Sequence, residues 1–147
     1  MINNLWEIRA FVYDHFKATT RPPSVKDTAV RFDLTNEEAA TAYEELGQRH
    51  AFFLSPDTHN ILMANPFSAV ETLFKVHANS KTYFANCAWD SLGIPAALRS
   101  DAEIEATCSQ SGYPIQLSIR DGQVSSSDVV VHFLVPFHDW YNDLVYT

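Results

Sequence analysis

The sequence has little cysteine, no block of basic residues and no long apolar run. Its two cysteines, Cys87 and Cys108, are too few for a disulfide framework and fit a reducing compartment. No stretch of the 147 residues approaches the roughly 20 apolar residues that a membrane span needs. Residues 1–6 show no basic segment followed by an apolar one, so we expect no signal peptide. These absences favour a cytoplasmic protein that does not cross a membrane.

The net charge is acidic, at −8 from 18 Asp and Glu against 10 Lys and Arg. Phosphate backbones and anionic lipids are bound by basic surfaces, so nucleic acid and membrane are poor partners for this chain. Hydrophobic residues make up 46% and charged residues 19%, which is typical of globular proteins. A chain of this length can bury a core without disulfides or a structural metal.

The first part of the sequence has the pattern of a helical unit. Apolar residues recur at helical spacing in residues 4–18 and 35–47. Between them, Ser24 is a candidate N-cap for a short helix that runs to about Phe32. Thr35 followed by Glu38 is a capping-box pattern at the start of the third segment. Two short strands are predicted next, at residues 51–54 and 61–64. Three helices followed by a strand pair is the order of a winged-helix domain.

The third helix argues against a DNA-reading role for this unit. It carries Glu37, Glu38, Glu44 and Glu45, and the basic Arg49 follows only at its end. Phosphates would repel such a helix. The charge pattern therefore favours a packing or substrate-gating module.

Asn65-Pro66 marks the predicted boundary between two domains, residues 1–65 and residues 66–147. Paired strands, one helix containing Pro95, and a hairpin turn at Asp121-Gly122 are predicted beyond it. The predicted strands are 72–76, 81–85, 104–108, 115–119 and a buried central strand at 129–135; the predicted helices are 88–98 and 138–144. We expect an α+β fold, with a winged-helix-like three-helix unit packed on a small mixed or antiparallel sheet with one helix.

Cys87 and Asp90 are the residues most able to carry chemistry. Cys87 stands at the predicted strand-to-helix junction, and Asp90 follows at a spacing that puts both on one helix face. A helix N-terminus favours a thiolate, so this position predicts a lowered pKa for Cys87. A carboxyl beside Trp89 and Leu92 can be desolvated and keep its proton. A soft thiolate next to a proton donor suits the removal of a soft metal from carbon.

Other interpretations of these residues stay open at this point. A free cysteine often only packs in a core, and an acid in the first helical turn is often a capping device. A zinc site is poorly supported, because there is no Cys-x-x-Cys pattern and the histidines are scattered. A cysteine hydrolase would need a histidine base, for which His132 or His138 are candidates without a local signature.

Three segments carry a resemblance to the organomercurial lyase (alkylmercury lyase) family. Cys-Ala-Trp-Asp-Ser-Leu at 87–92, followed by Pro-Ala-Ala-Leu at 95–98, resembles the family's active-site segment. Cys-Ser-Gln-Ser-Gly-Tyr-Pro-Ile at 108–115 is similar to its Cys-x-x-[Ser/Thr]-Gly-x-Pro-[Val/Ile] segment. Residues 131–136 resemble its central strand ending in proline.

The resemblance implies roles for individual residues. Cys87 matches the thiol that takes the organomercurial and transiently binds mercury. Asp90 matches the acid that protonates the leaving carbanion and assists deprotonation of the thiols. Cys108 matches a buried structural cysteine. The family's second catalytic cysteine lies beyond the segment that follows Pro136, and residues 137–147 contain no cysteine. Either the sequence stops short of that residue, or the protein is a minimal or diverged relative.

The function that the resemblance implies is cleavage of a carbon–mercury bond by thiolate capture and protonolysis. No resident cofactor is expected, and an external small thiol would act as co-substrate in place of the second cysteine. The expected partner is a small organometallic or thiol-reactive ligand. Two alternatives remain: a non-catalytic protein that binds a metal or thiol-reactive ligand through Cys87, and an acidic winged-helix interaction protein with Cys87 in its core.

Overall fold

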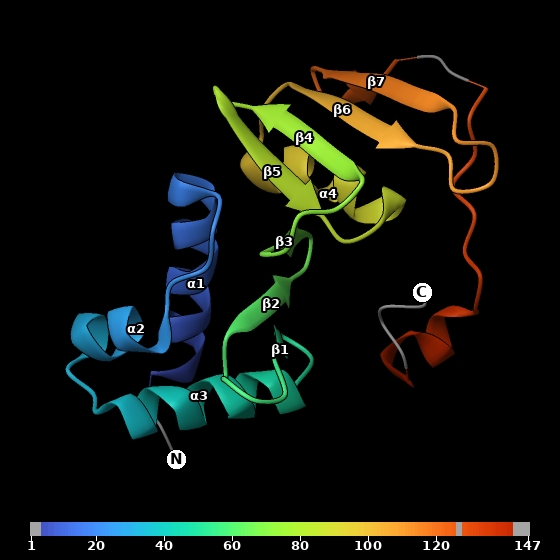
Figure 1. The fold of residues 1–147 in the computed structure, drawn as a ribbon. Helices are drawn as coiled ribbons and strands as arrows, with labels where there is room; N and C mark the ends of the chain where they lie inside the picture. The colour runs from blue at the N-terminus through green and yellow to red at the C-terminus, as the bar shows by residue number, and fades with distance from the viewer. Residues whose placement is uncertain (1–3, 126–127, 143–147) are drawn as a thin grey trace.

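The computed structural model describes residues 4–125 and 128–142, and this part of the chain is an α+β protein (Figure 1). It contains four α-helices, an eight-stranded antiparallel sheet and a short 3-10 helix. The elements in chain order are α1 (Leu5–Thr19), α2 (Val25–Phe32), α3 (Asn36–Gln48), β1 (Phe53–Leu54), β2 (Ile61–Ala64), β3 (Phe67–Ser68), β4 (Phe74–Ala78), β5 (Lys81–Ala85), α4 (Ala88–Leu98), β6 (Ala102–Thr107), β7 (Pro114–Arg120), β8 (Gln123–Val124) and η1 (Phe137–Asn142).

The three N-terminal helices form where the sequence predicts them, and two of them begin with capping boxes. The Thr35 hydroxyl accepts a hydrogen bond from the Glu38 N–H at 3.1 Å, and the Glu38 carboxylate accepts one from the Thr35 N–H at 2.8 Å. Ser24 and Asp27 make the same reciprocal pair at the start of α2. Each box satisfies backbone donors that a helix start otherwise leaves unpaired.

The apolar stripes of these helices are buried in one core that also includes the sheet. α1 contributes Leu5, Ile8, Val12 and Phe16. α3 contributes Ala42, Tyr43 and Leu46. The same cluster includes Phe67, Val76, Tyr83, Ile94 and Ile104 from the sheet and α4. Burial of these faces against the sheet stabilises helices that would be marginal in isolation.

The sheet has the strand order β1-β2-β3-β5-β4-β6-β7-β8. The predicted hairpin of β4 and β5 is confirmed, with Val76 opposite Tyr83. Two strands were not predicted, β3 and β8, because two residues are too few to show an alternating pattern. β3 pairs with β5 through Phe67 and Ala85, which joins the β1–β2 pair to the rest of the sheet.

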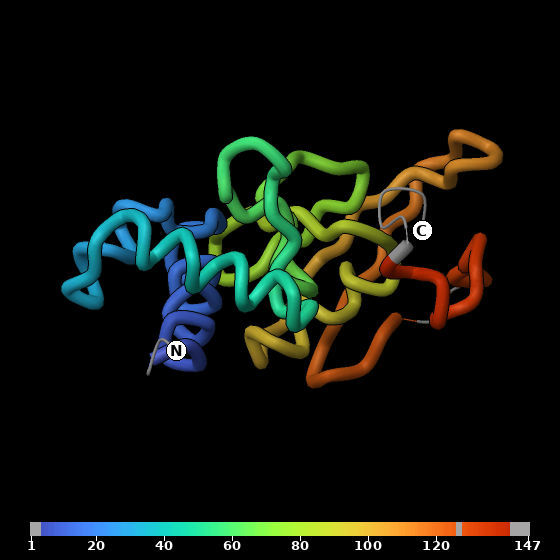
Figure 2. Tube along the Cα trace, turned by 90° about the horizontal axis from the view of Figure 1, so that it is seen from below, coloured from blue at the N-terminus to red at the C-terminus, as the bar shows by residue number. Residues whose placement is uncertain are grey.

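α4 packs against β4, β5 and β6 on one face of the sheet (Figure 1). The view from below places the three N-terminal helices at one end of the molecule and the β6–β7 hairpin at the other (Figure 2). None of the described helices has the length and apolar character needed to span a bilayer. The division into residues 1–65 and 66–147 stays a prediction.

The prediction of a buried central strand at residues 129–135 is wrong. This segment forms no strand, and Val130 is 87% exposed. A β-branched run indicates strand propensity, but neighbouring strands decide whether a strand forms. The aromatic residues here contact one another and α4: Phe133 stacks on Trp140 at 4.9 Å between centroids and lies 6.3 Å from Trp89.

The predicted helix at residues 138–144 is a 3-10 helix, η1, which begins one residue earlier. The part of the predicted helix that follows Asn142, including Leu144, lies outside the described residues. Tyr141 lies against His50 and Phe53 of the N-terminal part, at 4.1 and 6.0 Å between ring centroids.

Candidate active site

The candidate site lies where β5 ends and α4 begins. Cys87 is the N-cap residue of α4, with extended backbone at φ −142° and ψ 178°. Its carbonyl accepts a hydrogen bond from the Ser91 N–H at 3.1 Å, the first backbone bond of the helix. The predicted strand-to-helix junction at Cys87 is therefore confirmed.

The thiol of Cys87 and the carboxyl of Asp90 are in contact. Cys87 Sγ donates to Asp90 Oδ2 at 3.4 Å. The contact follows from the helix, because residues three apart in the first turn lie on one face. Both residues are half-buried, so water is partly excluded from the pair. The structure brings together the two residues that the sequence singles out.

Burial raises the pKa of Asp90, and the hydrogen bond from Cys87 opposes this only in part. This agrees with the expectation of a desolvated carboxyl that keeps its proton more readily.

The expected lowering of the Cys87 pKa is wrong. Burial, and then the charge of Asp90, raise the pKa of the thiol to about 11. The backbone N–H groups of Trp89 and Asp90 pull it down by less. A helix N-terminus favours a thiolate only while the sulfur stays hydrated, and here desolvation and a neighbouring carboxylate outweigh it.

Both pKa values are raised, which favours the proton-bound form of each group. Near neutral pH Cys87 is a thiol whose hydrogen points at the Asp90 carboxylate. A soft metal that binds this sulfur displaces the proton, and Asp90 is placed to receive it. The raised pKa of Asp90 favours keeping that proton until a stronger base appears.

Cys108 is not the buried strand residue that was expected. β6 ends at Thr107, and Cys108 is half-buried in the loop that follows. The loop is closed by hydrogen bonds from the Gly112 N–H to the Cys108 carbonyl and from the Cys108 N–H to the Tyr113 carbonyl, both at 2.9 Å. The Ser111 hydroxyl, together with nearby backbone N–H groups, lowers the pKa of Cys108.

These shifts predict that Cys108 is alkylated faster than Cys87 near neutral pH, by about tenfold or more. The rate at Cys87 should keep rising with pH towards its pKa of about 11. The rate at Cys108 should reach its half-maximal value at a lower pH, because the pKa of this thiol lies below the ordinary value of 9.0. Iodoacetamide kinetics in Cys87→Ser and Cys108→Ser measure each thiol alone. A faster Cys87 at neutral pH would show that the thiolate is stabilised after all.

α1 supplies side chains near this pair that sequence reasoning missed. The Tyr13 hydroxyl donates to the Asn65 carbonyl at 2.9 Å, and the Arg9 guanidinium lies 4.7 Å from the centre of the Tyr13 ring. Burial raises the pKa of Tyr13, and the charge of Asp90 adds to it. No local pattern marks Tyr13, because its role depends on a contact 52 residues away.

The histidines show no link to the candidate thiol. His138 Nε2 lies 3.0 Å from Asp139 Oδ2, and His132 is exposed. Among residues 4–125 and 128–142, no hydrogen bond joins Cys87 to an imidazole, and no group of three or more His, Cys, Asp or Glu side chains could hold a metal ion. The geometry therefore favours a thiol–carboxyl pair over a thiol–imidazole pair.

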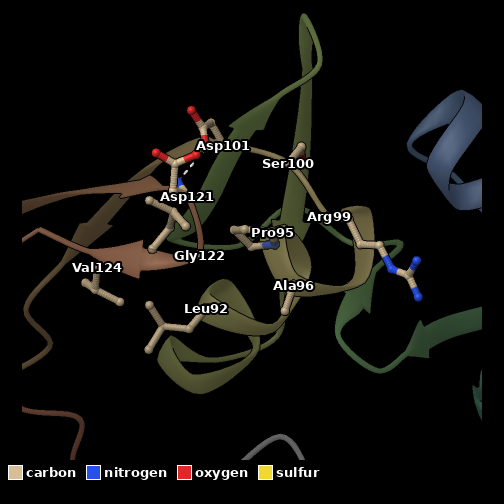
Figure 3. Close-up of a pocket in the computed structure, with 10 residues that line it drawn as sticks. Leu92, Pro95, Ala96, Arg99, Ser100, Asp101, Asp121, Gly122 and Val124 are labelled. Atoms are coloured by element: carbon tan, nitrogen blue, oxygen red, sulfur yellow. Dashed lines mark hydrogen bonds between the residues drawn. The ribbon is translucent and has the colours of Figure 1, made fainter.

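A cavity of about 460 Å³ lies against α4 and the β7–β8 turn (Figure 3). Its walls come from the later turns of α4, the following loop and the β7–β8 turn. The lining residues are Leu92, Pro95, Ala96, Arg99, Ser100, Asp101, Ile119, Asp121, Gly122 and Val124. Neither Cys87 nor Asp90 lines it, so it is not the candidate active site.

Fold and site together define an α+β protein with a thiol–carboxyl pair at the junction of a strand and a helix. The family model described as alkylmercury lyase matches residues 67–147, which is more than half of the chain and includes the pair. The chain belongs to the alkylmercury lyase family.

A solved structure, described as the mercury-bound form of MerB2, has a similar fold. It is 20% identical to this chain, with a TM-score of 0.70 over 87% of the chain. The match covers 61% of that protein, so this chain spans about three fifths of its length. No curated protein sequence matches the chain.

Proposed function

We propose that the protein is an organomercurial lyase-like enzyme that cleaves a carbon–mercury bond by thiolate capture and protonolysis. The observation that carries the proposal is the hydrogen bond from Cys87 Sγ to Asp90 Oδ2, inside the segment matched by the alkylmercury lyase model. A sulfur that binds mercury and an acid that protonates carbon are then within one helical turn.

In the first step, Cys87 captures the substrate. The sulfur bonds to mercury of R–Hg–X, the leaving group X⁻ departs, and the thiol proton passes to the Asp90 carboxylate. The products are Cys87–S–Hg–R and a protonated Asp90. The hydrogen bond already points the proton along this path.

In the second step, the carbon–mercury bond breaks. A second thiolate binds mercury, the bonding electron pair goes to carbon, and Asp90 delivers its proton to give R–H. The chain has only two cysteines, and Cys108 lies in a separate loop. We therefore propose that an external small thiol provides the second sulfur and leaves mercury bound between two sulfurs.

Headspace detection of methane tests the proposal directly. Wild-type protein with methylmercury and excess small thiol should release methane at a rate that rises with thiol concentration. Heat-unfolded protein with the same thiol is the control for chemical cleavage. If wild-type protein released methane no faster than the heat-unfolded control, the proposal of catalysis would be wrong.

A second candidate function is a ligand-binding protein that captures thiol-reactive metals without turnover. The observation that favours it is that only one of the two sulfurs needed for release stands at the site. Under this alternative, mass spectrometry would detect a stable organomercury adduct at Cys87, and no hydrocarbon would appear.

We further propose that residues 1–65 form a winged-helix-like unit that covers the site rather than reading DNA. It consists of three helices and the β1–β2 pair, and α1 approaches the site through Tyr13. Residues 66–147 would then be the catalytic domain. The partners of the protein would be small organomercurials rather than nucleic acid.

The exposed face of α3 predicts that the protein binds no duplex DNA specifically at physiological salt. Glu37, Glu38 and Glu44 are exposed on it, and Arg49 is paired with Glu45 at 2.7 Å. Fluorescence anisotropy with labelled duplexes measures this. Sub-micromolar binding with a steep salt dependence would contradict the proposal for this unit.

A further inference from the structure

α1 reaches the active-site helix through the segment that joins the two halves of the chain. The Tyr13 hydroxyl donates to the carbonyl of Asn65 at 2.9 Å, and its ring packs near Phe52 and Phe67, at 6.5 and 6.4 Å between centroids. The Arg9 guanidinium covers the ring from the same helix at 4.7 Å. These contacts fix the phenol, and the phenol in turn fixes the backbone at Asn65.

The next residue of that segment sits directly on α4. A Cβ built on Gly93 would lie 3.1 Å from Pro66 Cβ, closer than ordinary van der Waals contact. Gly93 follows Asp90 by three residues, so both lie on the same face of the helix. Pro66 therefore presses against the helix face that carries Asp90, and a side chain at position 93 would force Pro66 to shift by a few tenths of an ångström.

The pKa of Tyr13 also reflects its proximity to Asp90. Burial is the main reason why the pKa of Tyr13 is raised, and the charge of Asp90 raises it further. The phenol and the carboxyl are thus within electrostatic range, although they are not hydrogen-bonded to each other.

We propose that Tyr13 is a positioning residue: through Asn65 and the Pro66–Gly93 contact, it holds the first turns of α4 so that Asp90 stays against Cys87. The inference rests on the proposed function, and it adds a residue of the N-terminal unit to the active-site machinery. Tyr13 contacts neither the mercury nor the carbon in this arrangement. Its effect is on geometry alone.

Tyr13→Phe tests the proposal, since it removes the hydroxyl and keeps the ring. Hydrocarbon release from a preformed methylmercury adduct should fall on the order of tenfold, because a small misplacement of a catalytic group is costly. The final amount of methylmercury captured at Cys87 should stay within about twofold, because the strength of the sulfur–mercury bond does not depend on where Asp90 lies. Gly93→Ala pushes on Pro66 from the side of α4. It should likewise slow hydrocarbon release and leave capture of methylmercury nearly unchanged.

Tyr43→Phe is the matched control. Its hydroxyl also makes buried hydrogen bonds in the N-terminal unit, to Thr28 at 2.6 Å and to the Pro23 carbonyl at 3.2 Å, but it does not contact Asn65. It should lower the melting temperature without changing the release rate of folded protein. Equal release in Tyr13→Phe and Tyr43→Phe would reduce Tyr13 to a stability role and overturn the proposal.

A second readout does not depend on turnover. The effect of Asp90→Asn on the alkylation rate of Cys87 reports how closely the two side chains are coupled. We expect this effect to be at least about threefold smaller in the Tyr13→Phe background than in the wild-type background. An undiminished effect would refute the positioning role. If wild type releases no hydrocarbon, the proposed function fails. The comparison of alkylation rates in the two backgrounds still tests whether Tyr13 positions Asp90.

Discussion

Asp90→Asn should stop hydrocarbon release while leaving capture of the organomercurial largely intact. The amide keeps the shape of the side chain, but it cannot deliver a proton to carbon at neutral pH. Losing general-acid help costs on the order of 10²–10⁴ in rate. The sulfur–mercury bond at Cys87 does not depend on that proton once it has formed. Single-turnover methane release, paired with intact-protein mass spectrometry, measures both quantities.

Asp101→Asn is the matched control for this substitution. Its carboxylate also serves a local structural purpose, accepting a hydrogen bond from the Asp121 N–H at 3.0 Å, but it lies beside the separate cavity. It should capture and release like wild type. If Asp90→Asn also released methane at the wild-type rate, the proton would have to come from elsewhere, and the division of labour proposed for the pair would be wrong.

Cys87→Ser should abolish release altogether. A serine hydroxyl is a hard, weakly acidic ligand and cannot replace sulfur for a soft metal. The partly exposed Cys108, whose pKa is lowered, can still take up mercury in this variant. Peptide mapping should therefore place any remaining adduct at Cys108, and none should be converted to hydrocarbon.

The complementary variant isolates the active-site sulfur. Cys108→Ser should bind one organomercurial per chain, at Cys87, and should release hydrocarbon at close to the wild-type rate with small thiol present. A complete loss of release in Cys108→Ser would identify Cys108 as the second sulfur and would contradict the role proposed for the external thiol.

Local signals in the sequence predicted much of this molecule. Thr35 and Glu38 mark the start of α3 because a capping box is a contact between residues three apart. Cys87 and Asp90 were paired by the same kind of reasoning, since a helix fixes the spacing of its own side chains. The β4–β5 hairpin also depends on neighbouring residues.

Properties set by distant parts of the chain were not predictable. The pKa of Cys87 depends on how deeply the fold buries the sulfur, and burial reversed the shift expected from the helix terminus. The segment around Val130 has strand propensity but stays outside the sheet. Tyr13 approaches the site only because Asn65 and Pro66 pass between α1 and α4.

The central claim is that Cys87 holds the organomercurial while Asp90 protonates its carbon. The most direct test starts from the purified methylmercury adduct of Cys108→Ser, in which Cys87 is the only cysteine. After small thiol is added, intact mass and headspace gas are followed together. The account predicts that the protein-bound mercury loses its methyl group as an equal amount of methane appears. Thiol that strips methylmercury intact from Cys87, with no methane, would contradict it.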